Sequence, residues 1–207
     1  MYRALLVGKA NTGKSLLFIN LAQAFGCQRL TILSSSIHGS SKKAIFSPSL
    51  ARRHFVSSEP YHTKTLLETR VTFFSEGKQP KRLLLIDSPS LCNGVHPNPY
   101  TRKIMLLTLQ ALKEADLLIH VVDVSARGKP FFWEGVDERL SLYGRFGIRY
   151  VIAANKIDLV AGKEVLSRLS FLERQGQVVF LSALKKEGLK ELVQFLYASS
   201  IIKDNCI

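Results

Sequence analysis

The sequence predicts an α/β fold in three layers, with a mixed, mainly parallel sheet of six strands flanked by helices. Short apolar runs rich in β-formers alternate with segments of helical period, which is typical of βα units on a parallel sheet. The chain has 207 residues, enough to bury one α/β core and too few for two domains of average size. We therefore expect a single domain over residues 1–200 and a short tail at 201–207.

The strands and helices are predicted from nearly continuous apolar runs and from helical periodicity, respectively. The predicted strands are Arg3–Val7, Leu67–Phe74, Arg82–Asp87, Leu117–Asp123, Tyr150–Asn155 and Val178–Ser182. The predicted helices are Leu16–Phe25, about Tyr100–Lys113, about Phe131–Tyr143, Lys163–Gln175 and about Leu189–Ala198. A turn at Glu76–Pro80 predicts a hairpin that pairs the second strand antiparallel with the third.

A phosphate-binding loop stands between the first strand and the first helix. Residues 8–15 read Gly-Lys-Ala-Asn-Thr-Gly-Lys-Ser, the pattern G-x-x-x-x-G-K-[ST], in which backbone N–H groups and a helix N-terminus point at phosphate oxygens. We expect Lys14 to reach the β- and γ-phosphates and Ser15 to ligand Mg²⁺. The residues expected to contact phosphate are Gly8, Lys9, Ala10, Asn11, Thr12, Gly13, Lys14, Ser15 and Leu16.

A second motif, Asn155-Lys156-Ile157-Asp158, follows the fifth predicted strand and indicates the base. The carboxylate of Asp158 can accept hydrogen bonds from guanine N1–H and N2–H₂, whereas adenine has an acceptor at N1 and no N2 amine. Lys156 would lie over the ring and Asn155 would join this loop to the phosphate loop. A plain polar turn between strand and helix is the alternative for this tetrapeptide taken alone.

Ser182, Ala183 and Leu184 end the last strand and form a third candidate loop for the base. The backbone N–H of Ala183 would serve guanine O6. The dipeptide Ser-Ala is a weak motif, and its value comes from its position one strand and one helix after Asp158.

The segment Asp87-Ser88-Pro89-Ser90 follows a buried strand and predicts a magnesium and γ-phosphate contact. Asp87 is placed to hold Mg²⁺ through water. Ser90 stands where Gly is usual; it keeps the backbone N–H that would bond the γ-phosphate but not the freedom of a glycine.

The stretch from Gly26 to about Leu66 is rich in Ser, His, Lys and Arg and is predicted as a long functional or mobile loop. It lies after the first helix, where a nucleotide-sensing segment (switch I) is expected. A threonine in it should close over Mg²⁺ and the γ-phosphate, and Thr63 is preferred to Thr65. Two surface threonines are the alternative.

These elements, in this order, resemble the Era-like GTPases, the TrmE–Era–EngA–YihA–septin group of P-loop GTPases. The particular marks are Asn11 in the phosphate loop, the Asp87-x-Pro89 element and the ending from Ser182-Ala183 to Leu192. The chain departs from this group at Ser90, in the enlarged segment 26–66 and in the absence of an RNA-binding KH domain from the sequence.

The resemblance implies a Mg²⁺-dependent GTPase with a slow intrinsic rate. Leu91 occupies the position at which Ras-like enzymes carry a water-orienting Gln. In the Era-like group an Asn at the position of Asn11 can help hold K⁺ near the phosphates. Asn11, Lys14 and Thr63 are thus the candidate catalytic residues, and a GTP-binding interaction module with little hydrolysis is the rival hypothesis.

The chain carries a large positive charge, +13 from 29 Lys and Arg against 16 Asp and Glu. Between Ser40 and Arg82, nine basic residues stand against three acidic ones, which favours RNA or an anionic membrane surface as a partner. Taken with this charge, the resemblance to the Era-like group implies association with the ribosome or ribosomal RNA. A basic surface without a specific partner is the alternative. No apolar run is long enough to span a bilayer, and the first strand begins close to Met1, so we expect a cytoplasmic protein.

Overall fold

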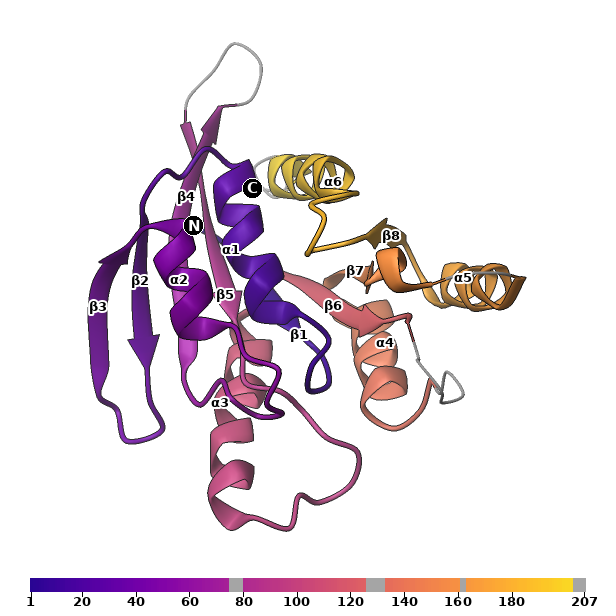
Figure 1. Ribbon diagram of the computed structural model, residues 1–207, viewed down its shortest axis with the longest axis horizontal. Helices are drawn as coiled ribbons and strands as arrows, with labels where there is room; N and C mark the ends of the chain where they lie inside the picture. Colours follow the sequence, from indigo (N-terminus) through magenta and orange to yellow (C-terminus); the bar gives the residue numbers. More distant parts are fainter. Residues whose placement is uncertain (75–79, 126–132, 161–162, 203–207) are drawn as a thin grey trace.

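The computed structural model describes residues 1–74, 80–125, 133–160 and 163–202, and places all its strands in one eight-stranded sheet (Figure 1). The sheet order is β3-β2-β4-β5-β1-β6-β7-β8. The strands are β1 (Tyr2–Val7), β2 (Leu30–Ser35), β3 (Ser41–Phe46), β4 (Leu66–Phe74), β5 (Pro80–Asp87), β6 (Leu117–Asp123), β7 (Arg149–Asn155) and β8 (Val178–Leu181). Pairing is parallel from β5 to β8 and antiparallel from β3 to β5.

Helices cover both faces of the sheet. They are α1 (Lys14–Ala24), α2 (Pro48–Phe55), α3 (Pro99–Glu114), α4 (Val136–Gly147), α5 (Lys163–Gln175) and α6 (Leu189–Ile202), with a short 3-10 turn at Ile157–Leu159. Alternate residues of β1 show the layering: Ala4 and Leu6 belong to the apolar cluster shared with α1, α2 and α6, whereas Leu5 and Val7 belong to the cluster shared with α3 and α4. A strand segment buried on both faces must be apolar, as Ala4–Val7 of this strand is. The α/β class in three layers is therefore confirmed.

The predicted number of six strands was wrong, because the segment 26–66 is largely ordered into a hairpin and a helix. Strands β2 and β3 pair antiparallel, with Leu33 opposite Lys43, and they extend the sheet beyond β4. β3 is the edge strand and is mostly exposed, so it carries lysines where an inner strand would carry apolar residues. Its sequence, Ser-Lys-Lys-Ala-Ile-Phe, therefore has no apolar run of the kind used to predict the other strands.

Helix α2 was missed because its start signals were interpreted as loop residues. Ser47 caps the helix by accepting a hydrogen bond from the Leu50 N–H at 3.3 Å, and Pro48 occupies the first turn, where its missing N–H has no cost. The basic residues of its last turn, Arg52 among them, suit the negative end of a helix dipole. Its only buried residue is Ala51, which packs on the core cluster.

The remaining elements agree closely with the predictions. β4 pairs antiparallel with β5, as expected, while the predicted turn at 76–80 lies outside the described residues except for Pro80, which begins β5. Helix α4 begins at Val136 and not near residue 131, and residues 126–132 are likewise outside the described part of the chain. Four loops that leave the carboxyl ends of β1, β5, β7 and β8 carry the candidate site.

Candidate nucleotide site

The phosphate loop joins β1 to α1, and its glycines are required by close packing. Gly13 has φ +92°, and a Cβ there would lie 2.4 Å from the side-chain nitrogen of Asn155. A Cβ on Gly8 would lie 2.4 Å from the carbonyl oxygen of Val121. Any larger residue would push the loop away from the sheet or from the Asn155 loop, so the spacing of the two glycines has a steric cause.

Lys14 is buried inside this loop with only 5% of its surface exposed. Its ammonium donates to the Lys9 carbonyl at 2.7 Å and to Ser90 Oγ at 3.0 Å. Burial lowers the pKa of Lys14 to about 8, and the negative charge of Asp87 opposes that shift. The lysine is thus a desolvated cation whose partners, a carbonyl and a hydroxyl, are neutral; it would bind phosphate oxygens more strongly than these groups.

Three oxygen-bearing side chains meet beside Lys14. Ser15 Oγ donates to Asp87 Oδ2 at 2.6 Å and lies 3.2 Å from Thr63 Oγ1, so the Thr63 hydroxyl donates to Ser15. Thr65 lies elsewhere and accepts a hydrogen bond from Ser34 Oγ at 2.9 Å. Of the two candidate threonines, Thr63 is the one that the structure places at the cluster.

Asp87 has the features of a cation ligand. It is fully buried, and among the described residues its Oδ1 has no hydrogen-bond partner. Burial raises the pKa of Asp87 to about 6, against the opposing effects of the Ser15 hydrogen bond and the Lys14 charge. An unpartnered buried carboxylate oxygen beside two hydroxyls fits a hard divalent cation such as Mg²⁺, which prefers oxygen ligands and retains water.

Asn155, at the end of β7, joins the phosphate loop to the last loop of the site. Its amide nitrogen donates to the Thr12 carbonyl at 2.8 Å, and its Oδ1 accepts from the Ala183 N–H at 2.8 Å. Lys156 follows in a left-handed conformation and pairs with Asp123 Oδ2 at 2.5 Å. Asp158 lies half-buried on the 3-10 turn that follows.

The Ala183 amide already has a hydrogen-bond partner in the structure, and its role toward a base stays a prediction. Its N–H was expected to serve guanine O6, but it already donates to Asn155, so a base would have to share or displace that bond. Ser182 Oγ accepts from the Lys185 N–H at 3.0 Å and closes the turn. Leu184 is 68% exposed, so its side chain is free to flank a ligand at the surface.

Ser90 and Leu91 point in different directions. Ser90 Oγ faces Lys14, as described above, whereas Leu91 is 9% exposed and packs in the apolar cluster with Leu5 and Leu112. The Leu91 N–H donates to the Gly8 carbonyl at 3.1 Å, which extends β-type pairing into the phosphate loop. The side chain at the usual water-orienting position is therefore part of the core.

Asn11 connects the phosphate loop to the 26–66 segment. It adopts φ +59°, a left-handed conformation that Asn tolerates, and its side-chain nitrogen donates to the Ser58 carbonyl at 2.9 Å. Within this loop Thr12 Oγ1 donates to the Lys9 carbonyl at 3.1 Å. Asn11 thus satisfies the demands of the turn and also reaches the segment that carries Thr63.

The cleft between the phosphate loop and residues 55–63 encloses about 50 Å³. Ligand pockets commonly measure about 300–1,000 Å³, so this cleft has room for a phosphate-sized group but not for a whole nucleotide. Its walls include Lys14, Ser15, Thr63 and Ser90, together with Leu16 from the first turn of α1.

Two buried polar connections were not predicted. Asn20 of α1 donates to the Ala183 carbonyl at 2.6 Å and accepts from Arg52 of α2 at 2.8 Å, which links α2 to the last loop of the site. Nothing in the local pattern marks Asn20, because its partners lie on α2 and beyond β8.

The second connection runs from the phosphate loop to α4. Lys9 Nζ pairs with Asp137 Oδ2 at 2.6 Å, and Asp137 Oδ1 lies 3.0 Å from His120 Nε2. His120 is fully buried on β6, and its Nδ1 lies 2.7 Å from the Tyr150 hydroxyl. Burial lowers the pKa of His120, and Asp137 opposes the shift. In the sequence, the one sign of this connection is a histidine within the otherwise mainly apolar strand Leu117–Asp123.

The phosphate loop, the oxygen cluster around Asp87 and the Asn155 loop together define the class as a P-loop nucleotide-binding protein. The model of one family, described as 50S ribosome-binding GTPase, matches residues 3–156. The chain therefore belongs to this family of GTPases.

The curated relatives that match this chain are named GTPase Obg. GTPase Obg of Caldanaerobacter subterraneus subsp. tengcongensis is 35% identical over 120 residues, covering 55% of this chain and 28% of that protein. GTPase Obg of Heliobacterium modesticaldum is 27% identical over 198 residues, covering 93% of this chain and 37% of that protein. The chain thus spans less than two fifths of the length of these relatives.

Solved structures of Era share the fold. Era of Aquifex aeolicus bound to GDP and AlF4⁻ matches with a TM-score of 0.67 and 21% identity, over 96% of this chain and 56% of that chain. Era in complex with MgGDPNP and a segment of 16S ribosomal RNA matches with a TM-score of 0.64 and 21% identity, over 94% of this chain and 55% of that one. The family match confirms the predicted P-loop GTPase, and these likenesses confirm that its fold is Era-like.

Proposed function

We propose that this chain binds guanine nucleotide with Mg²⁺ and hydrolyses GTP slowly, as a molecular switch. The observation that carries the proposal is the cluster that the buried Lys14 and Asp87 form with the half-buried Ser15 and Thr63. These residues come from the phosphate loop, the end of β5 and the 26–66 segment, so one phosphate group with its cation would contact all three parts.

The residues of the cluster have distinct roles in this proposal. Lys14 would exchange its bonds to Lys9 and Ser90 for bonds to the β- and γ-phosphates. Ser15, Thr63 and Asp87 would hold Mg²⁺, with Asp87 acting through water, and the ion would offset the negative charge of the phosphate oxygens. Thr63 would lose this ligand role once the γ-phosphate leaves, which is how the 26–66 segment would report the nucleotide state.

Guanine selectivity would rest on Asp158 and the loop that Asn155 holds. The two hydrogen bonds of Asn155 fix the relative positions of the phosphate loop and the Ser182–Leu184 loop, and Asp158 lies one short turn away. A carboxylate accepts from guanine N1–H and N2–H₂ but has no donor for adenine N1.

Slow hydrolysis follows from the burial of Leu91, because no side chain at that position can orient the attacking water. We propose that K⁺, held by Asn11 and by carbonyls near Ser58, supplies positive charge beside the phosphates. The rival function, a GTP-binding interaction module with little turnover, is favoured by the same buried Leu91 and by the Ser90 hydroxyl bound to Lys14.

Ribosomal RNA is the proposed biological context. The support is the net charge of +13 and the family description as ribosome-binding GTPases. The Era structure described above contains a segment of 16S ribosomal RNA, a finding about that protein which motivates the same expectation for this one. In the part of the chain that the structure describes, no helix is long and apolar enough to cross a bilayer. A cytoplasmic location remains a prediction.

Phosphate release separates the two functions. Wild-type protein and Lys14→Ala are incubated with Mg-GTP or Mg-ATP, with and without EDTA, and affinities for fluorescent mant-GDP are measured in parallel. We expect slow release from GTP alone, lost with EDTA and in the variant. Tight mant-GDP binding without any release would favour the interaction module, and the absence of guanine-nucleotide binding would refute both functions.

A further inference from the structure

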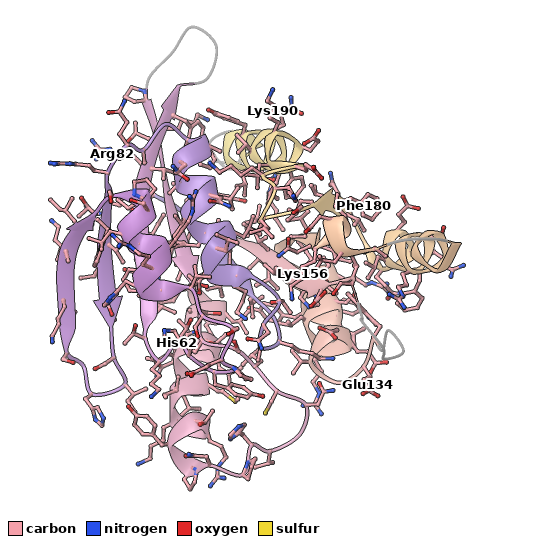
Figure 2. The ribbon with its side chains drawn as sticks, viewed as in Figure 1. His62, Arg82, Glu134, Lys156, Phe180 and Lys190 are labelled. Carbon is pink, nitrogen blue, oxygen red and sulfur yellow. The ribbon has the colours of Figure 1, made fainter. Side chains whose placement is uncertain are left out.

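A second groove lies beside the phosphate cleft, on the far side of the segment that carries Thr63. It has a volume of about 410 Å³ and is bounded by the β2–β3 hairpin, by α2 and by residues 62–65. Its lining residues are Ser34, Ser36, Ser40, Lys42, His54, Phe55, His62, Thr63, Lys64, Thr65 and Leu67. Figure 2 shows His62 near α2 and the β2–β3 hairpin, which bound the groove, and Lys190 on α6, away from them.

The floor of the groove is set by strand register. Lys42 of β3 stands opposite Ser34 of β2, and Ser34 stands opposite Leu67 of β4, so these three side chains lie in a row across the sheet. Ser34 Oγ donates to Thr65 Oγ1, which ties the floor to the 62–65 wall. Paired strands beneath a hydrogen-bonded wall make a formed groove.

The other wall is the last turn of α2. The His54 ring stacks on Phe46 of β3, with centroids 5.6 Å apart and planes 25° from parallel, and meets Phe55 edge-on at 4.7 Å. These contacts hold the imidazole in place while leaving it exposed.

The chemistry of the groove is that of a polyanion site. The groove presents two exposed ammonium groups, those of Lys42 and Lys64, and two exposed imidazoles, those of His54 and His62. Its remaining polar side chains carry hydroxyls. Among the described residues that line it, none is acidic. Ammonium and hydroxyl groups recognise phosphodiester oxygens, and imidazole rings can stack on unpaired bases.

A single strand of RNA fits these features better than a membrane does. The cations and hydroxyls surround a recess between secondary-structure elements, and a flexible strand can enter such a recess, whereas a bilayer surface meets protruding residues. The stacked ring of His54 offers a contact to a base that a lipid headgroup cannot use.

The groove shares a wall with the nucleotide site. Phe55, His62 and Thr63 line both the groove and the phosphate cleft. Thr63 contacts Ser15 on one side, and its neighbours Lys64 and Thr65 face the groove on the other. A ligand in the groove therefore contacts the segment that is expected to move with the nucleotide state.

We propose that this groove binds the sugar-phosphate backbone of single-stranded RNA and that its occupancy is coupled to the nucleotide through the 62–65 segment. The inference rests on the proposed GTP-dependent, RNA-associated function and adds to it the location of the RNA and the route of communication. Coupling of this kind is reciprocal: if the nucleotide state alters RNA affinity by some factor, RNA alters the relative affinity for the two nucleotides by the same factor.

The test uses a fluorescein-labelled, mixed-sequence 12-nucleotide single-stranded RNA and fluorescence anisotropy, with the protein bound to GDP or to GMPPNP. The groove variant is the double substitution K42Q/K64Q. The control, K113Q/K190Q, removes the same charge from exposed positions on α3 and α6. Unchanged mant-GDP affinity shows that each variant is folded.

Two lost phosphate contacts should weaken RNA binding about 25-fold at about 0.1 M salt, since each single-strand contact contributes about 0.7 to the slope of log K against log salt. The slope should fall by about 1.4, and the control should change affinity less than threefold. Wild-type RNA affinity should differ between GDP and GMPPNP, and that difference should shrink in the groove variant.

The outcomes distinguish the groove from the wider proposal. No RNA binding by wild-type protein at low salt would overturn RNA association and this inference together. Equal RNA binding by the groove and control variants would overturn the groove while leaving RNA association standing. If the groove variant no longer bound vesicles containing 30% phosphatidylglycerol but still bound RNA, the inference would be overturned in favour of a membrane.

Discussion

Asn155 gives the most informative single perturbation of the site, because its side chain holds two loops together. Asn155→Ala removes the bond to the Thr12 carbonyl and the bond from the Ala183 N–H, both 2.8 Å long and both buried. Each backbone group would be left without its partner, at a cost of about 1–3 kcal/mol. We therefore expect Asn155→Ala to lower the free energy of unfolding by about 2–6 kcal/mol and to weaken GDP binding as well.

The assay is urea denaturation without nucleotide, followed by mant-GDP titration of the folded protein. Asp158→Ala is the matched control, since Asp158 is proposed to bind the base and lies half-buried on a short surface turn. It should weaken GDP binding while changing stability by less than about 0.5 kcal/mol. The loss of stability in Asn155→Asp should lie between those of Asn155→Ala and Asp158→Ala, because the aspartate keeps an acceptor for the Ala183 N–H but places a negative charge against the Thr12 carbonyl.

Two results would refute this reasoning. One is an Asn155→Ala protein as stable as the wild type, which would mean that the two backbone groups are satisfied in another way. The other is an equal loss of stability in Asp158→Ala, which would mean that the loop as a whole, and not the hydrogen bonds of Asn155, sets the effect.

Three further predictions concern the ligands. Asp158→Asn should shift preference from guanine toward xanthine nucleotides, because an amide donor faces the xanthine carbonyl; unchanged relative affinities in a GDP and XDP titration would contradict this. Affinity for GDP should fall as pH rises above about 8, by up to about tenfold per unit, since binding requires the ammonium of Lys14 and its pKa in the free protein is about 8; titrations from pH 7 to 9.5 should show this slope in the wild type and not in Lys14→Ala. GTP hydrolysis should be faster in K⁺ than in Na⁺ at matched ionic strength, and Asn11→Ala should remove the difference while leaving GDP affinity nearly intact; equal rates in the two salts would eliminate the cation role.

The parallel half of the fold was predictable because its information is local. The strands β5, β1, β6 and β7 are largely buried on both faces and the edge strand β8 on one, so each appears as a mostly apolar run, and the loops after β1, β5, β7 and β8 carry the site motifs. The positions of Lys14, Ser15 and Asn155 follow from these runs alone. Parallel strands bring their carboxyl ends to one edge, so the motifs had to meet.

Strands β2 and β3 and helix α2 were not predictable by the same means, because β2 is buried on one face and β3 and α2 are hardly buried at all. β3 is an edge strand with lysines, and α2 buries a single alanine, so neither leaves an apolar pattern. Their order comes from contacts distant in sequence, such as Arg52 with Asn20 and Thr63 with Ser15. A prediction based on apolar runs assigns such a segment to a loop.

The 26–66 segment is attached to the site at two ends, and this makes it suited to sensing both the nucleotide and a ligand in the groove. Thr63 contacts Ser15 at the proposed cation end of the site, while Arg52 reaches the proposed base end through Asn20 and the Ala183 carbonyl. Helix α2 carries both Arg52 and the groove residue His54 in its last turn, two residues apart, and the helix is only eight residues long. A helix this short has little capacity to bend, so a shift of His54 toward a ligand would also displace Arg52. The bond from Arg52 to Asn20 would then transmit that displacement to the loop expected to hold the base.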